Sequence, residues 1–354
     1  MSIAPLRVVI VDRHAWYLPE IEKEKFRRIG AEVVVGWAET PSRPAAADEG
    51  CPKTEEERRR LSRLTSDYVS LAETTEDEVI RMARGAVAIL VVRADISARV
   101  MDALPDLRVI ARYGIGIDNI DVAAAQKRGI AVVNAPGFCA REVADHTMML
   151  ILALSRQLTY LQDGLRAGRW PRAVSPLRAL YSQTIGLIGF GGIGQEVARR
   201  AAAFGMSVIT YDPFIDAVRA REIGVTPVGL DDLLGRADYV SLHLPLSAQT
   251  QHLIGEQQLA LMKPTAFLVN TSRGALVDEC ALIASLESRT IAGAGLDVFE
   301  TEPLPTNSPL LKRSDVVLTS HIGGYSDESA EHLRRMVAHT VAELLATCAG
   351  GARQ

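Results

Sequence analysis

Short runs of apolar and mostly β-branched residues recur along the chain, and stretches with helical spacing separate most of them. Residues 6–11, 87–92 and 185–188 are typical runs. They are apolar almost throughout instead of alternating with polar residues, which is the pattern of strands buried on both faces of a parallel sheet. Strands that alternate with helices predict an α/β fold. The other predicted strands are residues 32–35, 108–111, 131–134, 207–211, 239–242, 266–269, 292–296 and 316–319.

The composition is that of a folded protein with about two domains. The chain has 354 residues, of which 48% are apolar and 23% are charged. These values exclude general disorder, and a domain takes about 150 residues. The 39 Lys and Arg against 43 Asp and Glu give a net charge of −4. This balance gives no support to a nucleic-acid or membrane partner, because both need clustered excess cations.

The cysteines and the N-terminus point to a reducing, cytoplasmic setting. The four cysteines lie far apart and form no C-x-x-C pair, so they fit neither a disulfide framework nor a zinc site. No metal is expected. Residues 1–11 contain no apolar core long enough for a signal peptide. The cysteines are Cys51, Cys139, Cys280 and Cys348.

Residues 40–63 interrupt the alternation of strands and helices. The segment contains PSRPAAADEG followed by KTEEERRRLSR. Its Pro, Gly and mixed charges predict a solvated loop that runs into a short charged helix. A surface excursion is the favoured interpretation, and a partner-binding or substrate-lid element is the alternative.

The strongest local signal is a glycine-rich turn between a predicted strand and a helix. The strand at residues 185–188 runs into GFGGIG at residues 189–194, which includes Gly192. In a dinucleotide-binding turn, Gly189 would permit the tight bend and Gly191 would leave room for a pyrophosphate, while Gly194 would let helix and strand pack closely. The amides and the dipole at the start of the helix would attract the phosphates.

The strand that follows this helix ends at an acidic residue. Asp212 comes directly after the predicted strand at residues 207–211. A carboxylate at this position can accept hydrogen bonds from the adenosine ribose hydroxyls. It would also repel the 2′-phosphate of NADP. The pattern therefore predicts NAD(H) in preference to NADP(H), and a solvated Asp after an ordinary turn is the alternative.

Three later segments place polar residues where predicted strands end, the edge at which open α/β sheets bind ligands. Arg273 can hold a carboxylate through paired hydrogen bonds. His321 can exchange the hydroxyl proton in hydride-transfer chemistry. Glu302, in a run of acids after residues 292–296, would orient that imidazole. Taken alone, the histidine is more often structural, and the arginine has an ordinary surface role as its alternative.

These segments belong to a longer series of motifs between about residues 86 and 346. With this series the chain resembles the D-isomer-specific 2-hydroxyacid dehydrogenases, a family that includes phosphoglycerate dehydrogenase, glyoxylate reductases and D-lactate dehydrogenases. The segments CAREVADHTMMLILALSR and HIGGYSDES are most similar to the subgroup around C-terminal-binding protein. The series is RYGIGIDNIDVAAA, VVNAPG, GLIGFGGIGQEVA, YDPF, VSLHLPL, MKPTAFLVNTSRGALVDE, AGAGLDVFETEPL and TSHIGG.

The resemblance implies roles for the matching residues. Arg273 would bind the substrate carboxylate and carbonyl, and Glu302 and His321 would form the acid–base pair. Asp297 would face the nicotinamide carboxamide. The remaining cofactor-lining positions would be Ile193, near the pyrophosphate, and Leu244, Pro245 and Thr271. The turn that would hold the substrate carboxylate on its amides consists of Tyr113, Gly114, Ile115 and Gly116.

Two departures from the family pattern bear on binding. Gly192 stands where many relatives have Arg, so a side-chain contact to the pyrophosphate is expected to be missing. Gly323 and Gly324 occupy a stretch where corepressor-like members usually have Trp. A wider or differently filled substrate pocket is expected from these two glycines.

The resemblance also implies an architecture. Two Rossmann-like domains are expected, with an NAD-binding domain at residues 135–321 inserted into a flavodoxin-like substrate domain at residues 1–134 and 322–354. The site would lie in the cleft between them, and closure would exclude water. A helix at residues 143–158 is the family's usual dimer element, so a homodimer is expected.

The favoured function is an NAD-dependent D-2-hydroxyacid dehydrogenase or 2-oxoacid reductase. Hydride would move between nicotinamide C4 and C2 of a small anionic 2-hydroxy or 2-oxo acid. An NADH-sensing, corepressor-like regulator that binds a protein partner is the alternative. Formate oxidation is disfavoured, because that branch has Gln in place of Glu302. The substrate stays open between a simple carboxylate, a phosphorylated hydroxy acid and a phosphonate.

Overall fold

The computed structural model of the chain describes residues 6–12, 20–36, 74–172 and 177–350. The predicted insertion at residues 40–63 lies outside these ranges. The chain divides into two compact units: unit 1 comprises Met1–Phe138 and Ala330–Gln354, and unit 2 comprises Cys139–Ser329. These limits fall a few residues after the domain boundaries expected from the resemblance, which remain a prediction.

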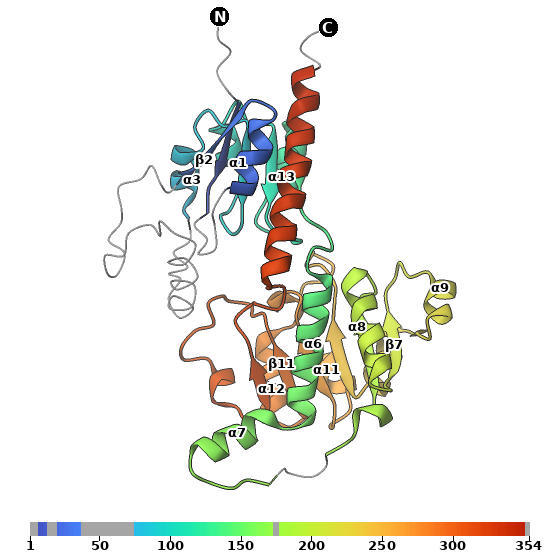
Figure 1. Cartoon of the computed structure of the whole chain (residues 1–354). Coiled ribbons are helices and arrows are strands. Elements are labelled where there is room, and N and C mark those ends of the chain that lie inside the picture. The colour runs from blue at the N-terminus through green and yellow to red at the C-terminus, as the bar shows by residue number, and fades with distance from the viewer. Residues whose placement is uncertain (1–5, 13–19, 37–73, 173–176, 351–354) are drawn as a thin grey trace, which may run out of the picture. The chain divides into compact units, whose positions relative to one another are not determined.

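Unit 1 contains a five-stranded parallel sheet in the order β2-β1-β3-β4-β5. This is the flavodoxin-like order, in which the strand sequence reverses between β1 and β3. Its helices lie on both faces of the sheet (Figure 1). The elements are β1 Leu6–Ile10, α1 Glu20–Arg27, β2 Ala31–Val35, α3 Glu76–Met82, β3 Ala88–Val91, α4 Ala98–Asp102, β4 Val109–Arg112, α5 Val122–Lys127, β5 Ala131–Val133 and the long α13 Asp327–Gly350.

Two apolar clusters fix these helices to the sheet of unit 1. On one face, Phe26 of α1 and Val341 of α13 pack with Ile10 and Leu90. On the other face, residues of α3, α4 and α5 pack around Ile89. Because the strands are covered on both sides, most of their side chains are apolar, which is why they read as nearly continuous apolar runs.

A buried carboxylate joins three elements of unit 1. The side chain of Glu22 on α1 is fully buried. Its Oε2 accepts a hydrogen bond of 2.8 Å from Arg334 on α13, and its Oε1 accepts one of 3.1 Å from the Tyr113 hydroxyl. A buried charge is tolerated when it is paired and hydrogen-bonded in this way. Glu22 therefore fixes the position of Tyr113 at the end of β4.

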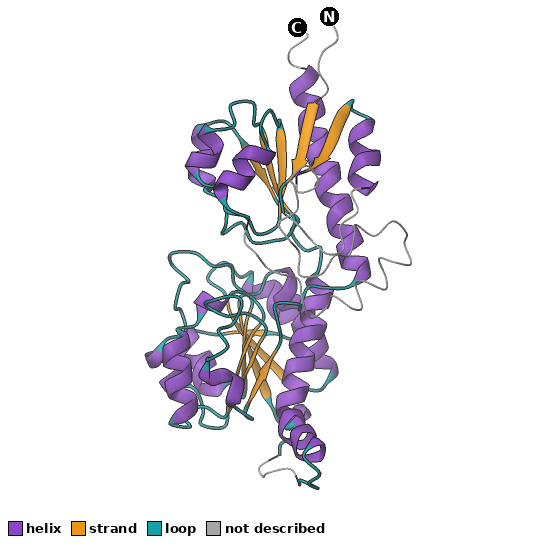
Figure 2. Cartoon of the chain, turned by 90° about the vertical axis from the view of Figure 1, so that its left-hand side faces the viewer, coloured by secondary structure: helices purple, strands orange, loops and turns teal. Residues whose placement is uncertain are grey.

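Unit 2 contains a seven-stranded parallel sheet in the order β12-β11-β10-β9-β6-β7-β8. The order reverses between β6 and β9, as it does in a dinucleotide-binding fold. Helices cover both faces of this sheet (Figure 2). The strands are β6 Thr184–Ile188, β7 Ser207–Tyr211, β8 Thr226–Pro227, β9 Tyr239–Leu242, β10 Phe267–Asn270, β11 Gly293–Leu296 and β12 Val316–Leu318.

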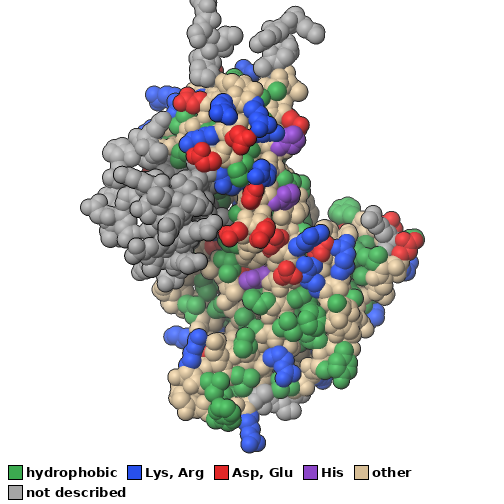
Figure 3. Space-filling view, in the orientation of Figure 1, with side chains coloured by type: hydrophobic (Ala, Val, Ile, Leu, Met, Phe, Trp, Pro, Cys, Tyr) green, Lys and Arg blue, Asp and Glu red, His purple; other side chains and the backbone are tan. Residues whose placement is uncertain are grey.

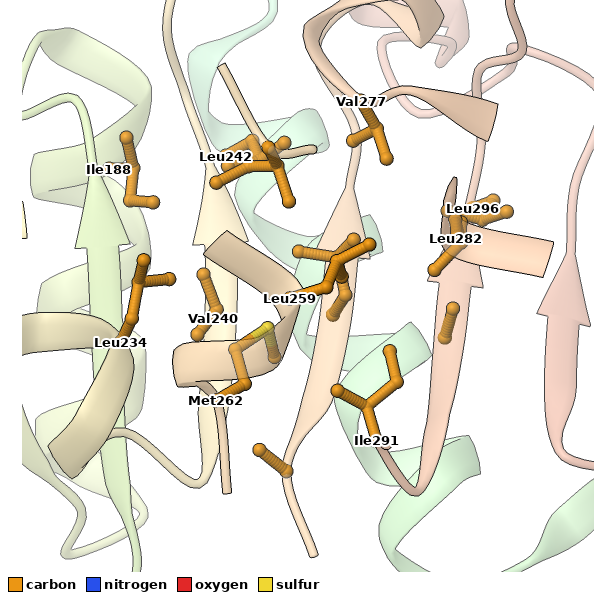
Figure 4. Packing of buried hydrophobic residues seen from close by; sticks show 14 of the residues in the cluster. Ile188, Leu234, Val240, Leu242, Leu259, Met262, Val277, Leu282, Ile291 and Leu296 are labelled. Atoms are coloured by element: carbon orange, nitrogen blue, oxygen red, sulfur yellow. The ribbon is translucent and has the colours of Figure 1, made fainter. Parts of the chain in front are cut away.

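The helices of unit 2 pack on the sheet in two layers. Residues of α10, α11 and α12 cover one face, where Leu234, Leu259 and Leu282 pack against Val240 and Leu296 (Figure 4). Residues of α6 and α8 cover the other face around Leu187. The helices are α6 Ala140–Ser155, α7 Leu158–Arg166, α8 Gly192–Ala203, α9 Ala217–Glu222, α10 Leu230–Arg236, α11 Glu256–Leu261 and α12 Glu279–Glu287, with short 3-10 turns at Leu180–Ser182, Gly274–Leu276 and Pro309–Lys312.

The predicted α/β class and all predicted strands are confirmed, with each strand end within one residue of its expected place. Strand β8 was not predicted, because two residues that include a proline carry no periodic pattern. The predicted end of the helix expected at residues 143–158 is wrong. The helix stops at Ser155, and Gln157 has a left-handed φ of 53°, which turns the chain before α7 begins.

We predict that Glu22→Ala lowers the free energy of unfolding of unit 1 by about 3–5 kcal/mol, because it leaves the Arg334 charge buried without this partner. Hydrogen exchange of the β1 and β4 amides in increasing urea measures this change. Glu24→Ala on the same helix is the control, since Glu24 is exposed and its ion pair with Arg28 lies on the surface. A loss within about 0.5 kcal/mol for both variants would contradict the structural role of Glu22.

Candidate active site

The turn between β6 and α8 depends on two close backbone approaches. Gly189 has a φ of 97°, and a Cβ at this position would lie 2.6 Å from the His243 carbonyl oxygen. A Cβ on Gly194 would lie 2.4 Å from the Gly189 carbonyl oxygen. Both distances are too short for any side chain, so glycine is required at both positions.

The same turn is open on its outer side. A Cβ on Gly191 or Gly192 would meet no heavy atom within 4 Å. The amides of Gly192, Ile193 and Gly194 begin α8 and donate no hydrogen bond to any other residue in the described part of the chain. Free amides and a helix dipole at an open turn form a cradle for phosphate groups. The residues present therefore fit a dinucleotide pyrophosphate, and an arginine at position 192 would also have room.

Asp212 lies beside this cradle at the end of β7. Its Oδ2 accepts a hydrogen bond of 2.8 Å from the Phe190 amide, and its Oδ1 accepts one of 2.9 Å from the Phe214 amide. Each carboxylate oxygen can accept a further bond. The carboxylate is thus held next to the glycine turn, where the adenosine ribose of a bound dinucleotide would lie in such a fold.

Two further predicted cofactor positions flank the turn. Leu244 follows β9 and reaches to 3.0 Å from the position of a Cβ on Gly189. Pro245 is exposed beside it. Thr271 follows β10, is buried, and shares a hydrogen bond of 3.0 Å with Thr147 of α6. All three follow strands at the carboxyl edge of the sheet, and their contacts with a cofactor remain predictions.

Arg273 and the turn after β11 are brought together by a backbone contact at Gly274. A Cβ on Gly274 would lie only 1.9 Å from the carbonyl carbon of Phe299. The half-buried Arg273, whose Nη1 donates a 2.7 Å hydrogen bond to the Ser272 carbonyl, therefore lies next to the segment that leads into Glu302. Any side chain at position 274 would push these two segments apart.

Glu302 and His321 form a direct pair. His321 Nδ1 lies 2.7 Å from Glu302 Oε2, and Glu302 Oε1 accepts a 3.1 Å hydrogen bond from the Phe299 amide. His321 has a left-handed φ of 56°, which is uncommon for a residue other than glycine. Its Nε2 makes no hydrogen bond to any residue that the structure describes. The ring is therefore oriented through Nδ1, and its expected role in proton exchange through Nε2 remains a prediction.

Asp297 fixes the backbone of the loop that carries His321. Its carboxylate accepts hydrogen bonds from Thr319 Oγ1 (2.6 Å) and from the amides of Ile322 (3.0 Å) and Gly323 (2.8 Å). Burial alone would raise the pKa of Asp297, but these bonds and the nearby His146 outweigh it and hold the pKa below its ordinary value. The ionised carboxylate thus stabilises the loop in its strained form. Its expected contact with the nicotinamide carboxamide remains a prediction.

Gly323 and Gly324 do not open a space in this loop. A Cβ on Gly323 would lie 2.9 Å from Asp297 Oδ2, and a Cβ on Gly324 would lie 3.0 Å from Cys139 Sγ. The space beside both glycines is filled by neighbouring side chains of unit 2. Close packing therefore accounts for these two glycines, and the expected wider or differently filled substrate pocket remains a prediction.

Three histidines to which the sequence pattern assigned no role lie near this edge. His146 Nε2 is 2.8 Å from Thr319 Oγ1 and 3.4 Å from Asp297 Oδ1. His252 contacts Glu300. Burial lowers the pKa of His243 to about 3, so this imidazole stays neutral and is excluded as a proton donor. No periodicity in the sequence marks these contacts, since each joins residues of separate elements.

In unit 1, the predicted substrate-binding turn follows β4. Arg112 Nη1 donates a 2.8 Å hydrogen bond to the Tyr113 carbonyl and lies over Gly114, whose φ is 149°. The amides of Ile115 and Gly116 donate to no other residue in the part of the chain that the structure describes. Both amides are free to bind an anion, as expected for a carboxylate-binding turn, and this role remains a prediction.

Asp12 lies at the carboxyl edge of the sheet of unit 1, and the sequence pattern did not indicate its contacts. It follows β1 at the point where the strand order reverses, and its carboxylate accepts hydrogen bonds from the amides of Val92, Arg93 and Ala94 after β3. Burial raises the pKa of Asp12 although these amides and the charge of Arg112 oppose the rise. The contact joins the end of β1 to the loop after β3.

Comparison with known proteins matches this chain to one family. Residues 148–323 match the NAD-binding domain of the D-isomer-specific 2-hydroxyacid dehydrogenases. A glyoxylate reductase of Korarchaeum cryptofilum is 46% identical over 250 residues, which cover 70% of this chain and 75% of the reductase. The chain belongs to the D-isomer-specific 2-hydroxyacid dehydrogenase family.

Two further relatives show how far the match extends. A D-3-phosphoglycerate dehydrogenase of Mycobacterium leprae is 44% identical over 251 residues, which cover 71% of this chain and 47% of that protein. The chain therefore spans about half the length of this relative. The crystal structure of a D-lactate dehydrogenase of Aquifex aeolicus, complexed with NAD and lactic acid, superposes with a TM-score of 0.75 at 27% identity and covers 96% of this chain and 95% of that one.

Membership of the family defines the class of chemistry. The chain is an oxidoreductase of the CH–OH group with a nicotinamide dinucleotide, NAD(H), as cofactor. The similarity to the C-terminal-binding-protein subgroup is not confirmed by these relatives. In the part of the chain that the structure describes, no helix is long and apolar enough to cross a membrane, and no three potential metal ligands gather at one point.

Proposed function

We propose that the protein is an NAD-dependent D-2-hydroxyacid dehydrogenase that reduces a small 2-oxo acid to the D-2-hydroxy acid and catalyses the reverse oxidation. The observation that carries this proposal is the Glu302–His321 pair, whose Nδ1 and Oε2 atoms are 2.7 Å apart. Glu302 follows β11, and the neighbouring strand β10 leads into Arg273. The bound nicotinamide supplies or accepts the hydride. The residues of this chain bind the acid and exchange the proton.

His321 is the proton-exchanging residue in this proposal. In reduction its Nε2–H gives a proton to the substrate oxygen as C2 receives the hydride, and in oxidation the neutral ring takes that proton back. Glu302 holds Nδ1 and so fixes the orientation of the ring. Arg273 binds the substrate carboxylate and stabilises negative charge on the reacting oxygen, for which a guanidinium is well suited.

The substrate that we favour is a short 2-oxo acid with a single anionic group, such as glyoxylate. The support for this choice is the relative named glyoxylate reductase, of which the chain covers 75%, compared with 47% of the phosphoglycerate dehydrogenase. A cytoplasmic location and the D configuration of the product belong to the same proposal.

We further propose a homodimer formed through α6 and α7. Helix α7 buries only Gly164, while Leu158 and Leu165 are 54% and 53% exposed, and Trp170 after it is 86% exposed. Hydrophobic side chains gather on this face of unit 2 (Figure 3). Contiguous exposed apolar surface on a soluble domain marks an interaction site, and the family resemblance names a second copy of this chain as its occupant.

The first test of the function is NADH-dependent reduction across a panel of 2-oxo acids that includes glyoxylate, pyruvate, hydroxypyruvate, branched and aromatic oxo acids, and a phosphonate analogue. We predict turnover with at least one short member. We also predict that His321→Gln lowers kcat by at least about 100-fold while the Kd of NADH stays within about twofold, because a general acid contributes about 10²–10⁴ to the rate.

His332→Gln is the matched control for this substitution, since His332 is an exposed histidine on α13. Fluorescence titration measures NADH binding for all three proteins. Equal losses of NADH binding and turnover in His321→Gln would show that the residue supports the fold of the site and not the proton transfer.

Asp212 is predicted to set the preference for NADH. Asp212→Asn keeps the size of the side chain but removes the charge that would repel the 2′-phosphate, so the ratio of kcat/KM for NADH to that for NADPH should fall about tenfold or more. Steady-state kinetics with both cofactors measure the ratio. Asp216→Asn, in the loop before α9, serves as the control, and an unchanged ratio in Asp212→Asn would contradict this role.

The dimer is predicted to have twice the mass of one chain in light scattering after size exclusion. Leu158→Arg combined with Leu165→Arg should produce a monomer, because each charge would be buried in the apolar interface. Leu311→Arg is the control, since Leu311 is 50% exposed in the 3-10 turn Pro309–Lys312, whose Leu310 packs in the cluster with α10, α11 and α12. If the double variant keeps the mass of a dimer, α7 is not the interface.

A further inference from the structure

A second histidine–carboxylate contact lies on the turn that carries Glu302. His252 Nε2 is 2.5 Å from Glu300 Oε1, and Glu300 stands two residues before Glu302. His252 comes from the loop after β9 and has a left-handed φ of 52°. Since residues other than glycine rarely adopt this conformation, it is maintained by its surroundings. One of these is a 2.8 Å hydrogen bond from the His252 amide to the Ala275 carbonyl.

The first residue of α12 holds the turn from another side. The Glu300 amide donates a 3.3 Å hydrogen bond to Glu279 Oε2. Burial and the charge of Glu300 together raise the pKa of Glu279, although this hydrogen bond opposes the rise. The carboxylates of Glu279 on α12 and Glu300 on the turn therefore lie near each other, and His252 contacts Glu300.

The turn at residues 299–302 is thus fixed at three points. Gly274 packs against the Phe299 backbone, His252 and Glu279 hold Glu300, and the Phe299 amide binds Glu302 Oε1. The last contact leaves Glu302 Oε2 for His321. A shift of Glu300 would move the Glu302 backbone two residues further on, and with it the carboxylate that orients His321.

We propose that His252 and Glu300 form a clasp that positions Glu302 against His321, so that His252 is a positioning residue for proton exchange in the reaction proposed above, on which this inference rests. The two side chains of the clasp are 45% and 31% exposed, and ion pairs of such exposure contribute little to global stability. Its loss therefore changes the geometry of the turn more than the stability of the fold.

The first test compares His252→Ala, His252→Gln and the wild-type enzyme. His252→Ala is expected to lower kcat about tenfold with KM for the oxo acid and the Kd of NADH within about twofold, because displacement of a catalytic group by about 1 Å costs up to roughly 100-fold in rate. His252→Gln should recover most of the rate, since its amide N–H can donate to Glu300. A rise in KM without a fall in kcat would overturn the proposal.

A matched control comes from unit 1. His339 and Glu343 form an exposed i,i+4 pair on α13 at 3.2 Å, with exposed fractions of 56% and 66%. His339→Ala removes a histidine–glutamate contact of the same kind and should leave kcat unchanged. An equal loss in both variants would show that the effect belongs to any surface pair and not to the clasp.

A double-mutant cycle with Glu302→Gln separates positioning from general destabilisation. If the clasp acts only through the Glu302 carboxylate, His252→Ala in the Glu302→Gln background should reduce kcat by less than about twofold. If His252 supports the site in some other way, the two losses multiply. Multiplying losses would overturn the proposal.

Hydrogen exchange gives a test that does not need turnover. His252→Ala should increase amide exchange in residues 297–302 and leave the amides of β6 unchanged. If the wild-type enzyme reduces none of the oxo acids, the proposed function fails. The amide exchange of this turn still shows whether His252 holds it in place. Unchanged exchange at residues 297–302 would overturn the clasp even in an active enzyme.

Discussion

The close approach of two backbone segments at Gly274 is the constraint on which the candidate active site depends. A side-chain carbon at this position would lie 1.9 Å from the Phe299 carbonyl carbon. Because the segments after β10 and β11 touch without a side chain between them, Arg273 and the turn that carries Glu302 share one small region of the strand edge. The parallel pairing of β10 and β11, in register from Phe267 to Asn270, then sets the distance between the segments that follow these two strands.

A buried carboxylate provides the second fixed point. Asp297 follows β11 and accepts hydrogen bonds from the loop after β12, so it joins the ends of two neighbouring strands. The loop holds His321 in a left-handed conformation that costs about 1–3 kcal/mol. Several hydrogen bonds to one ionised group can offset that cost, as charge-assisted bonds are stronger than neutral ones. The ionised Asp297 carboxylate, whose pKa is held low, therefore offsets the local backbone strain at His321.

The sequence allows the fold and the main site residues to be predicted, because both follow from local patterns. Buried parallel strands are apolar along their whole length, and the glycine turn must contain glycine at Gly189 and Gly194 for steric reasons. Polar residues directly after strands reach the same edge of a sheet by topology alone. Arg273, Glu302 and His321 could be selected in this way, although their roles in turnover remain proposals.

The contacts that support these residues could not be predicted from the sequence. Asp12, Glu22 and His252 each bind groups far away in the chain, and nothing in their neighbouring residues indicates the partner. Gly323 shows the same limit in another form. The sequence shows that a side chain is absent there, and the structure shows that Asp297 lies beside the position it would occupy. A residue pattern records which side chain is missing, and only the packing shows what fills its place.

The two units contain different parts of the candidate site. Unit 2 contains the open glycine turn, Asp212 and the Glu302–His321 pair, and the match to the family's NAD-binding domain falls wholly within it. Unit 1 offers the free amides of Ile115 and Gly116. A backbone amide binds any small anion, whereas discrimination between oxo acids needs side chains that contact the rest of the molecule. The glycine turn has a conformation that only certain residues permit, whereas the proposed choice of oxo acid would depend on contacts that the amides of Ile115 and Gly116 alone do not specify.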